Sequence, residues 1–276
     1  MLEMSEPHAT EFRRLVRGGA GARDIHGRLP PTTGFARRTL ASDASVAREM
    51  GRVEAYRSSS CALLEAFTGR APCVLDVGCS TGAGAVAMAL SPILAPDVVV
   101  GVDTATLSLK AARVRARGHG LAPPRVSFRG CRAGCPLPFA DDSFDLVVCV
   151  SVLEFMPTAS QRRELVEEMK RVVRPGGHFF LATPSPLRLR EMHSRRWLGN
   201  FVRRDGYPWA TPPWEIERLV SDFHPLPVGR WVAARALQRV GLAARRVPPP
   251  VAGILARASA WQRVLVRKPQ GASIRA

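Results

Sequence analysis

The chain has 276 residues, 46% of them hydrophobic, which is enough to bury the core of one α/β domain with additions. Its net charge is +17, the six cysteines lack the spacing of a disulfide framework or a zinc site, and no 18-residue apolar run occurs. An apolar signal-peptide segment is also missing near residue 1, so we expect a cytoplasmic protein without a membrane span or a metal site.

The first 44 residues differ in composition from the rest of the chain. Residues 1–44 combine Gly and Pro clusters with many Arg residues and show no sustained hydrophobic period, so we expect a basic, mobile arm. From Ser45, a candidate helix N-cap, to Phe67, apolar residues recur among helix formers, which predicts one or two helices. We expect the globular domain to occupy residues 45–276.

Strand-like and helix-like segments alternate from residue 73 onward. This alternation is typical of a mostly parallel sheet with helices on both faces, whose ligands bind at the carboxyl ends of the strands. The predicted strands are 73–77, 98–102, 126–128, 144–150 and 178–182, and the predicted helices are 82–91, 105–117 and 160–173.

The segment 74–85, with the sequence VLDVGCSTGAGA, is the most specific feature of the chain. An apolar strand enters a turn with glycines at Gly78 and Gly82, which let the backbone approach a ligand because no Cβ intervenes. The spacing differs from the dinucleotide fingerprint, and Asp76 would repel a pyrophosphate but suits an ammonium group. Asp103, at the end of the next strand, can accept hydrogen bonds from ribose hydroxyls. Together they predict a pocket for a nucleoside that carries an amino acid.

Four ordered motifs between Cys73 and Thr183 resemble those of class I S-adenosylmethionine-dependent methyltransferases of the small-molecule type. They are the glycine loop, Asp103, the segment 137–145 (LPFADDSFD) and the Arg-Pro-Gly-Gly turn at 174–177. The resemblance implies a three-layer Rossmann-like α/β fold, with a mostly parallel seven-stranded sheet and a C-terminal antiparallel hairpin. Helix 230–240 and the strand-like segments 241–247 and 262–267 match the last helix and that hairpin.

The resemblance also implies S-adenosylmethionine as the cofactor and methyl transfer to an O, N or C atom of a small metabolite or a lipid- or glycan-linked substrate. Relatives carry an Asp for adenine after the third strand; here Cys131 stands there, so this contact falls to the backbone or to Arg132. Some relatives carry a His where this chain has Phe155, so no general base is supplied at that position. The expected cofactor contacts are Asp76, Gly78, Cys79, Ser80, Gly82, Asp103, Thr104, Cys131, Arg132, Ser151 and Val152.

The segment 184–229 is expected to be an insert on the substrate side, because it leaves the sheet at the carboxyl edge and is rich in Pro, Arg and aromatic residues. Aromatic rings can stack on a planar substrate, although a loop fixed by its aromatic residues fits the same composition. The candidate general bases are His193, Glu154, Asp205 and Tyr207, and His193 is the best of them because its ordinary pKa lies near 6.5. The candidate substrate contacts are Trp197, Tyr207, Trp209 and Trp214.

The positive charge leaves an RNA methyltransferase as the alternative. Residues 184–276 hold 16 Arg and one Lys against five acidic residues, a net charge of +12 that suits RNA or an anionic membrane leaflet. RNA base methyltransferases often carry an Asn/Asp-Pro-Pro-Tyr/Phe run after the fourth strand, where this chain reads SVLE at 151–154. We therefore favour a small-molecule or lipid- or glycan-linked substrate, with peripheral membrane contact left open and the oligomeric state undetermined.

Overall fold

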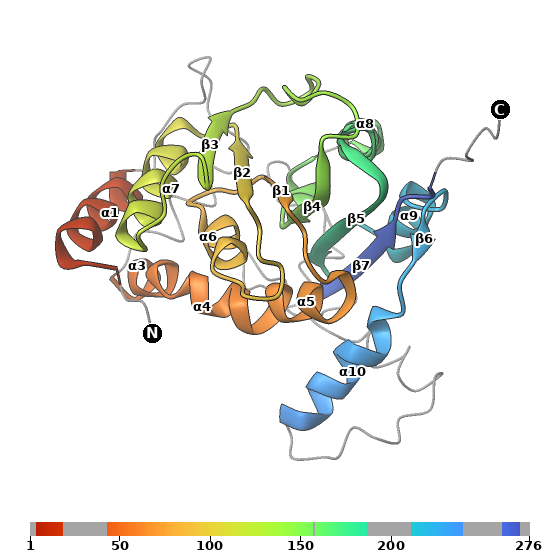
Figure 1. Cartoon of the computed structure of the whole chain (residues 1–276), viewed down its shortest axis with the longest axis horizontal. Coiled ribbons are helices and arrows are strands. Elements are labelled where there is room, and N and C mark those ends of the chain that lie inside the picture. Colours follow the sequence, from red (N-terminus) through yellow and green to blue (C-terminus); the bar gives the residue numbers. More distant parts are fainter. Residues whose placement is uncertain (1–3, 19–42, 157, 187–210, 240–260, 271–276) are drawn as a thin grey trace.

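A seven-stranded sheet forms the centre of the protein (Figure 1). The structure is a computed structural model that describes residues 4–18, 43–156, 158–186, 211–239 and 261–270. The strand order is β3-β2-β1-β4-β5-β7-β6, with β1 to β5 parallel and β7 antiparallel to both of its neighbours. This confirms the predicted α/β fold. The strands are β1 (Cys73–Val77), β2 (Val98–Asp103), β3 (Val126–Gly130), β4 (Phe144–Val150), β5 (Val173–Pro184), β6 (His224–Pro225) and β7 (Trp261–Arg267).

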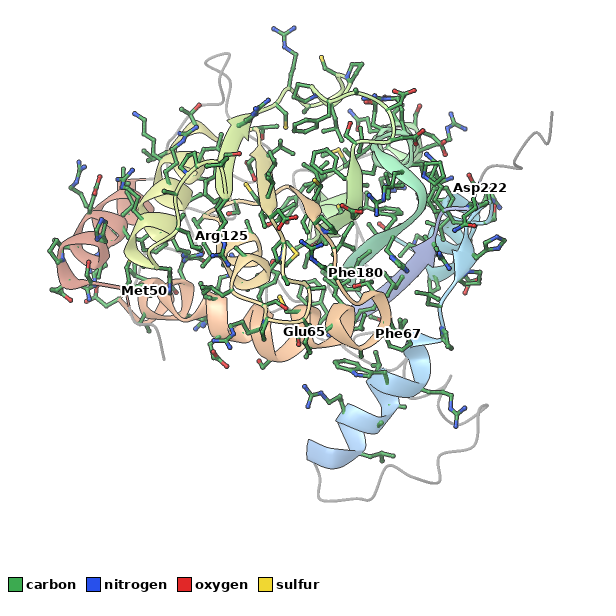
Figure 2. All side chains as sticks on the ribbon, in the orientation of Figure 1. Met50, Glu65, Phe67, Arg125, Phe180 and Asp222 are labelled. Carbon is green, nitrogen blue, oxygen red and sulfur yellow. The ribbon has the colours of Figure 1, made fainter. Side chains whose placement is uncertain are left out.

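Helices cover both faces of the sheet (Figure 1). On one face lie α5 (Ala62–Thr68), α6 (Ala83–Ala89), α7 (Thr106–Gly118) and α10 (Val228–Arg239), and on the other lie α8 (Ala159–Val172) and α9 (Pro213–Leu219). Successive residues of a strand point to opposite faces, so Val74 of β1 packs on the first side and Leu75 on the second. Phe180 of β5, labelled in Figure 2, is fully buried. The apolar strands are therefore buried on both faces, as parallel strands require.

The beginning of the chain is helical and packed. Helix α1 (Glu6–Gly18) lies against α7 and buries Phe12, Leu15 and Val16. The expected mobile arm is therefore wrong for residues 6–18, because apolar residues spaced three to four apart give this helix one buried face. The rest of that arm, residues 1–3 and 19–42, lies outside the described residues.

A run of short helices leads from the beginning of the chain to β1. Helix α3 (Asp43–Met50) begins at Asp43, so Ser45 lies inside the helix and is not its N-cap. Helix α4 (Arg52–Tyr56), a π-helical turn at Arg57–Cys61 and α5 then follow without a break. These helices cover the side of the sheet on which α6 lies.

The last part of the sheet differs from the prediction in two places. Strand β5 starts at Val173, because the Arg-Pro-Gly-Gly segment forms a bulge within it: Phe144 pairs with Val173 but Leu146 pairs with His178. The outer partner of β7 is β6, which precedes α10, whereas the predicted hairpin strand 241–247 lies outside the described residues. Residues 213–225, expected in the substrate-side insert, include α9 and β6, and Ile216, Leu219, Val220 and Phe223 among them are buried in the core.

Candidate active site

The glycine loop follows β1 and turns sharply over the end of β2. The Gly78 N–H donates to the Val102 carbonyl at 2.8 Å, and Gly78 has a φ of +72°. A Cβ on Gly78 would lie 2.2 Å from Cγ2 of Val152, and one on Gly82 (φ +79°) would lie 2.9 Å from the Phe128 ring. Both positions therefore need glycine for conformation and for packing, and this packing fixes the loop against the rest of the site.

Asp76 is a buried carboxylate beneath this loop. Its side chain receives the Ala85 N–H from the first turn of α6, and the residue is only 5% exposed. A Cβ on Gly84 would lie 2.9 Å from its Oδ2 and 3.3 Å from the Tyr56 ring, so a glycine at this position lets all three groups approach. Burial raises the pKa of Asp76 to about 7, and the neighbouring Asp103 adds to the rise. A buried carboxylate of this kind fits a cationic ligand group.

Asp103 lies at the carboxyl end of β2, beside the same loop. Its Oδ2 accepts the Ser80 N–H at 2.8 Å, and its Oδ1 accepts the Ala105 N–H at 2.8 Å just before α7 begins. Burial raises its pKa, and these backbone donors oppose the rise. A carboxylate has about four acceptor sites, so Asp103 can hold the loop and still receive hydroxyl donors. Thr104 follows directly and is half-buried.

Two cysteines expected at the site contribute little charge. Cys131 follows β3, and its N–H donates to the Asp103 carbonyl at 3.1 Å. Burial, reinforced by the charge of Asp103, raises the pKa of the Cys131 thiol to about 12, so the thiol is neutral near pH 7. The Cys79 side chain is buried against β2, where its Sγ would lie 2.9 Å from a Cβ on Gly101. The Cys79 side chain is thus part of the packing beneath the loop, while Arg132 lies beside Cys131 on the loop that follows β3.

The end of β4 meets the glycine loop, because a Cβ on Gly78 would lie 2.2 Å from Cγ2 of Val152. Ser151 has a φ of +63°, and its N–H donates to the Ala182 carbonyl of β5 at 2.8 Å. Its hydroxyl hydrogen-bonds to Oε1 of Glu154, and the Thr183 hydroxyl donates to Oε2 of Glu154 at 3.2 Å. Glu154 is 2% exposed, so the ends of β4 and β5 enclose a carboxylate that is satisfied by hydroxyl groups.

Arg52 and Glu49 were missed by the sequence analysis. Arg52 donates to Oε2 of Glu49 at 3.1 Å and to the Tyr56 hydroxyl at 3.4 Å, and its charge opposes the raised pKa of Asp76. The spacing of Glu49, Arg52 and Tyr56 places them on one helical face, a signal that could have been read. Arg52 is thus a cation close to the buried Asp76.

Two of the four sequence motifs, Asp145 of the segment 137–145 and the Arg-Pro-Gly-Gly turn at 174–177, stabilise the sheet at the amino ends of its strands. Oδ2 of Asp145 accepts the Cys73 N–H at 2.7 Å where β1 begins, and Arg174 forms an ion pair with Asp145. Gly177 lies so close that a Cβ there would be 2.9 Å from the Asp145 carbonyl oxygen. These residues therefore join the amino ends of the strands and do not reach the ligand edge.

Of the residues predicted for the substrate side, His193, Trp197, Tyr207 and Trp209 lie outside the described residues. Trp214 is described: it lies in the first turn of α9 and is 67% exposed. Its contact with a substrate therefore stays a proposal.

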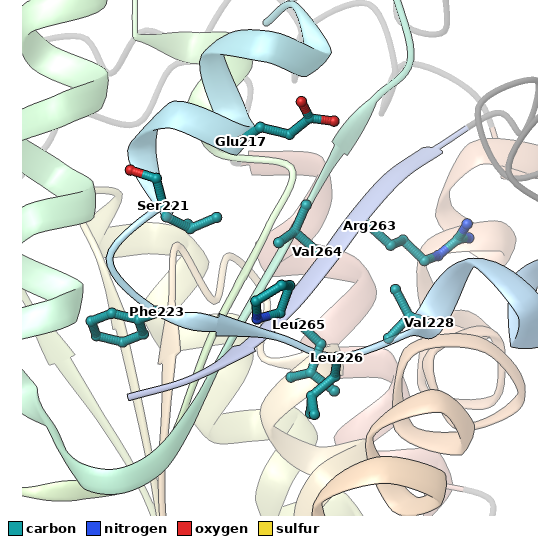
Figure 3. A pocket seen from close by; sticks show the side chains of 10 residues that line it. Glu217, Ser221, Phe223, Leu226, Val228, Arg263, Val264 and Leu265 are labelled. Atoms are coloured by element: carbon teal, nitrogen blue, oxygen red, sulfur yellow. The ribbon is translucent and has the colours of Figure 1, made fainter. Parts of the chain in front are cut away.

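A hollow of ≈ 270 Å³ lies at the other end of the sheet (Figure 3). Its lining comes from α9, β6, β7 and the start of α10, and includes Phe223, Leu226 and Leu265. Strands β4 and β5 separate this edge from β1 and β2, so the hollow is distinct from the glycine-loop site. Within the described ranges, no cluster of three or more His, Cys, Asp or Glu is placed to hold a metal ion, and no helix is long and apolar enough to cross a bilayer.

Comparison with known proteins agrees with this geometry. Residues 75–181 match the family described as "Methyltransferase domain". The chain is 39% identical over 109 residues to methyltransferase GfsG of Streptomyces halstedii, covering 40% of this chain and 36% of that protein. It is 36% identical over 110 residues to a ubiquinone biosynthesis O-methyltransferase of Paracidovorax citrulli, covering 40% and 42%. The matches thus span less than half the length of these curated relatives.

The solved structure of N-methyltransferase NodS from Bradyrhizobium japonicum, in complex with S-adenosylhomocysteine, has the same fold. It aligns with a TM-score of 0.56 at 17% identity and covers 88% of this chain and 100% of that one. The sheet order defines a Rossmann-like fold, and two acids, Asp76 and Asp103, lie beside its glycine loop. Residues 75–181 are thus similar to a methyltransferase domain, and the curated relatives that match this chain are methyltransferases.

Proposed function

We propose that the protein transfers a methyl group from S-adenosylmethionine to a hydroxyl oxygen of a small molecule. The observation that carries the proposal is the placement of Asp76 and Asp103 at the carboxyl ends of the adjacent strands β1 and β2, with the glycine loop between them. The hydroxyl acceptor is supported by the relative named as an O-methyltransferase.

The described residues fit the parts of this cofactor. Asp76 would face the ammonium group, because it is buried and carries a raised pKa that a cation would lower. Arg52 would face the carboxylate, and Asp103 would accept the ribose hydroxyls. Cys131 and the backbone beside it would border the adenine. When bound, the cofactor supplies a methyl group on a sulfonium, which is a strong electrophile.

The protein itself must position the acceptor hydroxyl next to this methyl group. Ser151 and Val152 lie beside the glycine loop, so an acceptor held there would meet the methyl group in line. A hydroxyl acceptor must lose its proton, and the Ser151 hydroxyl is hydrogen-bonded to Glu154. We propose that Glu154 is the general base and that Ser151 relays the proton to it. The proton of the acceptor hydroxyl moves to Oγ of Ser151 as the serine proton moves to Oε1 of Glu154. His193 is the competing candidate.

The first test is calorimetry with S-adenosylmethionine and S-adenosylhomocysteine, with NADH as the control ligand. Binding of the first two and no binding of NADH supports the proposal. The acceptor is then sought by incubating the enzyme with methyl-labelled cofactor and fractionated metabolites, and by comparing Glu154→Gln with His193→Gln on the acceptor found. A lower rate and an altered pH profile for Glu154→Gln alone would support the serine–glutamate route, and the reverse result would assign the base to His193.

The RNA alternative rests on the net charge of +17. It makes a separate prediction, since RNA binding through phosphates weakens steeply with added salt. Titration of the protein with labelled RNA at 50 and 200 mM salt distinguishes the two proposals. Flotation with anionic vesicles applies the same charge argument to a membrane surface.

A further inference from the structure

A buried polar cluster joins the glycine loop to α3 and α7. Its centre is Arg115 of α7, whose side chain is 0% exposed. Nη1 of Arg115 donates to Oγ1 of Thr81 at 3.0 Å, and Nη2 donates to the Glu49 carbonyl at 2.6 Å and to Oε1 of Glu49 at 3.4 Å. The Thr81 hydroxyl in turn donates to Oε1 of Glu49. The three residues come from α7, the glycine loop and α3, and they close a triangle of hydrogen bonds.

We propose that Glu49, Arg115 and Thr81 are positioning residues that hold the glycine loop in its cofactor-binding conformation and tie it to the N-terminal helices. The inference rests on the proposed function, because it concerns the same cofactor site. None of the three was expected to act from the sequence.

The position of Thr81 in the loop carries the first part of the argument. Its neighbour Ser80 donates its N–H to Asp103, and its other neighbour, Gly82, is the N-cap of α6 with a φ of +79°. Ser80 itself has a φ of +50°, which a non-glycine residue adopts only where its surroundings impose it. The Thr81 hydroxyl fixes the middle of this strained turn, so its loss would displace the Ser80 N–H and the Asp103 carboxylate.

Glu49 provides a second link to the site. It accepts from Arg52, which reaches the Tyr56 hydroxyl and whose charge acts on Asp76. Burial opposes ionisation of Glu49, but Arg52 and Arg115 still hold its pKa below the usual range. The Glu49 carboxylate therefore orders Arg52 on one side and Thr81 on the other.

The cluster also fixes the N-terminal helices. The guanidinium carbon of Arg115 lies 4.4 Å from the centre of the Phe12 ring of α1, and Phe12 is fully buried. Burying an ion pair stabilises a fold less than apolar packing of the same volume would. Stabilisation of the fold alone therefore explains poorly why Glu49, Arg115 and Thr81 are buried here. Positioning of the glycine loop relative to helices α1 and α3 explains the presence of these polar groups better. Coupling is reciprocal, so a ligand on the loop should also order these helices.

The test uses the full chain with S-adenosylhomocysteine as the probe. Thr81→Val removes the hydroxyl with little change of shape, Thr81→Ser keeps the hydroxyl, and Glu49→Gln removes the charge. Arg13→Ala is the matched control, because it removes an exposed ion pair with Glu6 on the same helix α1. Calorimetry gives the affinity, and hydrogen exchange of residues 6–18 and 43–50, with and without the probe, gives the coupling.

We expect Thr81→Val and Glu49→Gln to weaken binding at least tenfold and to lose the protection that the probe gives to residues 6–18 and 43–50. Thr81→Ser and Arg13→Ala should behave as the wild type in both measurements. Wild-type binding together with unchanged affinity in a folded Thr81→Val protein would overturn the inference, as would a wild type whose helices gain no protection. A wild type that binds no S-adenosylhomocysteine would instead overturn the proposed function, and the inference with it.

Discussion

Burial of the ionised Asp76 carboxylate lowers the free energy of unfolding, so replacing Asp76 with an uncharged residue should stabilise the protein. In an unfolded chain an Asp titrates near 3.9, whereas burial raises the pKa of Asp76 to about 7 in the folded protein without ligand. Between pH 4 and pH 7 the folded state therefore binds the proton more tightly than the unfolded state, so this group lowers stability as pH rises through that window. A rise in the pKa of Asp76 from about 3.9 to about 7 lowers the free energy of unfolding by about 4 kcal/mol above pH 7.

Asp76→Asn is uncharged at every pH, and the amide oxygen can still accept the Ala85 N–H. We expect the variant to be more stable than the wild type by up to about 4 kcal/mol at pH 8 and nearly equal at pH 4. At pH 8 this corresponds to a rise in melting temperature on the order of 10 °C. Binding of S-adenosylhomocysteine should weaken at least tenfold, because the ammonium partner loses its counter-charge.

The assay is urea unfolding at pH 4, 6 and 8, with Asp145→Asn as the control. Asp145 is also a buried carboxylate, but it is paired with Arg174, so its replacement should destabilise the protein. A stability gain in Asp76→Asn that does not change with pH, or a loss at pH 8, would refute the reasoning about burial of this charge.

Three other expectations follow from the same contacts. The affinity for S-adenosylhomocysteine should fall about 25-fold between pH 7.5 and pH 5.5, because the ammonium group of the ligand requires ionised Asp76 and Asp76 becomes protonated below its pKa of about 7. An affinity that calorimetry finds unchanged over this pH range would contradict this. Gly78→Ala should lower the free energy of unfolding by about 2 kcal/mol or more, and Val152→Ala in the same chain should restore part of it, because the added Cβ meets Val152 at 2.2 Å. Glu215→Gln should cost about 2 kcal/mol in urea unfolding, because Arg162 donates to both Glu215 oxygens at 2.6 and 3.1 Å between α8 and α9, and an unchanged midpoint would count against that ion pair.

The parallel core could be predicted because its strands are apolar runs flanked by turn residues, and β1 and β4 match the expected bounds. Three features were not predicted, and each failure has a physical reason. A two-residue edge strand such as β6 is too short to carry any alternation, and the bulge in β5 depends on pairing with β4. Helix α1 was missed because its Arg residues hide an apolar face that is completed only by contact with α7.

The positions of the residues at the carboxyl ends of β1 and β2 were predicted better than the contacts that support them. Asp76, Asp103 and the loop glycines could be placed because small and acidic residues at strand ends have a local signature. Arg115 could not, because in the sequence it reads as an exposed charge and only the tertiary pairing with Glu49 makes its burial possible. Asp145 was part of a recognised motif, yet it joins strand ends at the opposite edge of the sheet.

The central claim is that the loop between Asp76 and Asp103 binds S-adenosylmethionine. Calorimetry of the wild type and of Asp103→Ala with S-adenosylmethionine tests it most directly, with circular dichroism to show that both are folded. The account predicts one site in the wild type and binding weakened at least tenfold in the variant, which loses the ribose acceptor and the anchor of Ser80. No binding by the folded wild type, or equal affinity in the two proteins, would contradict it.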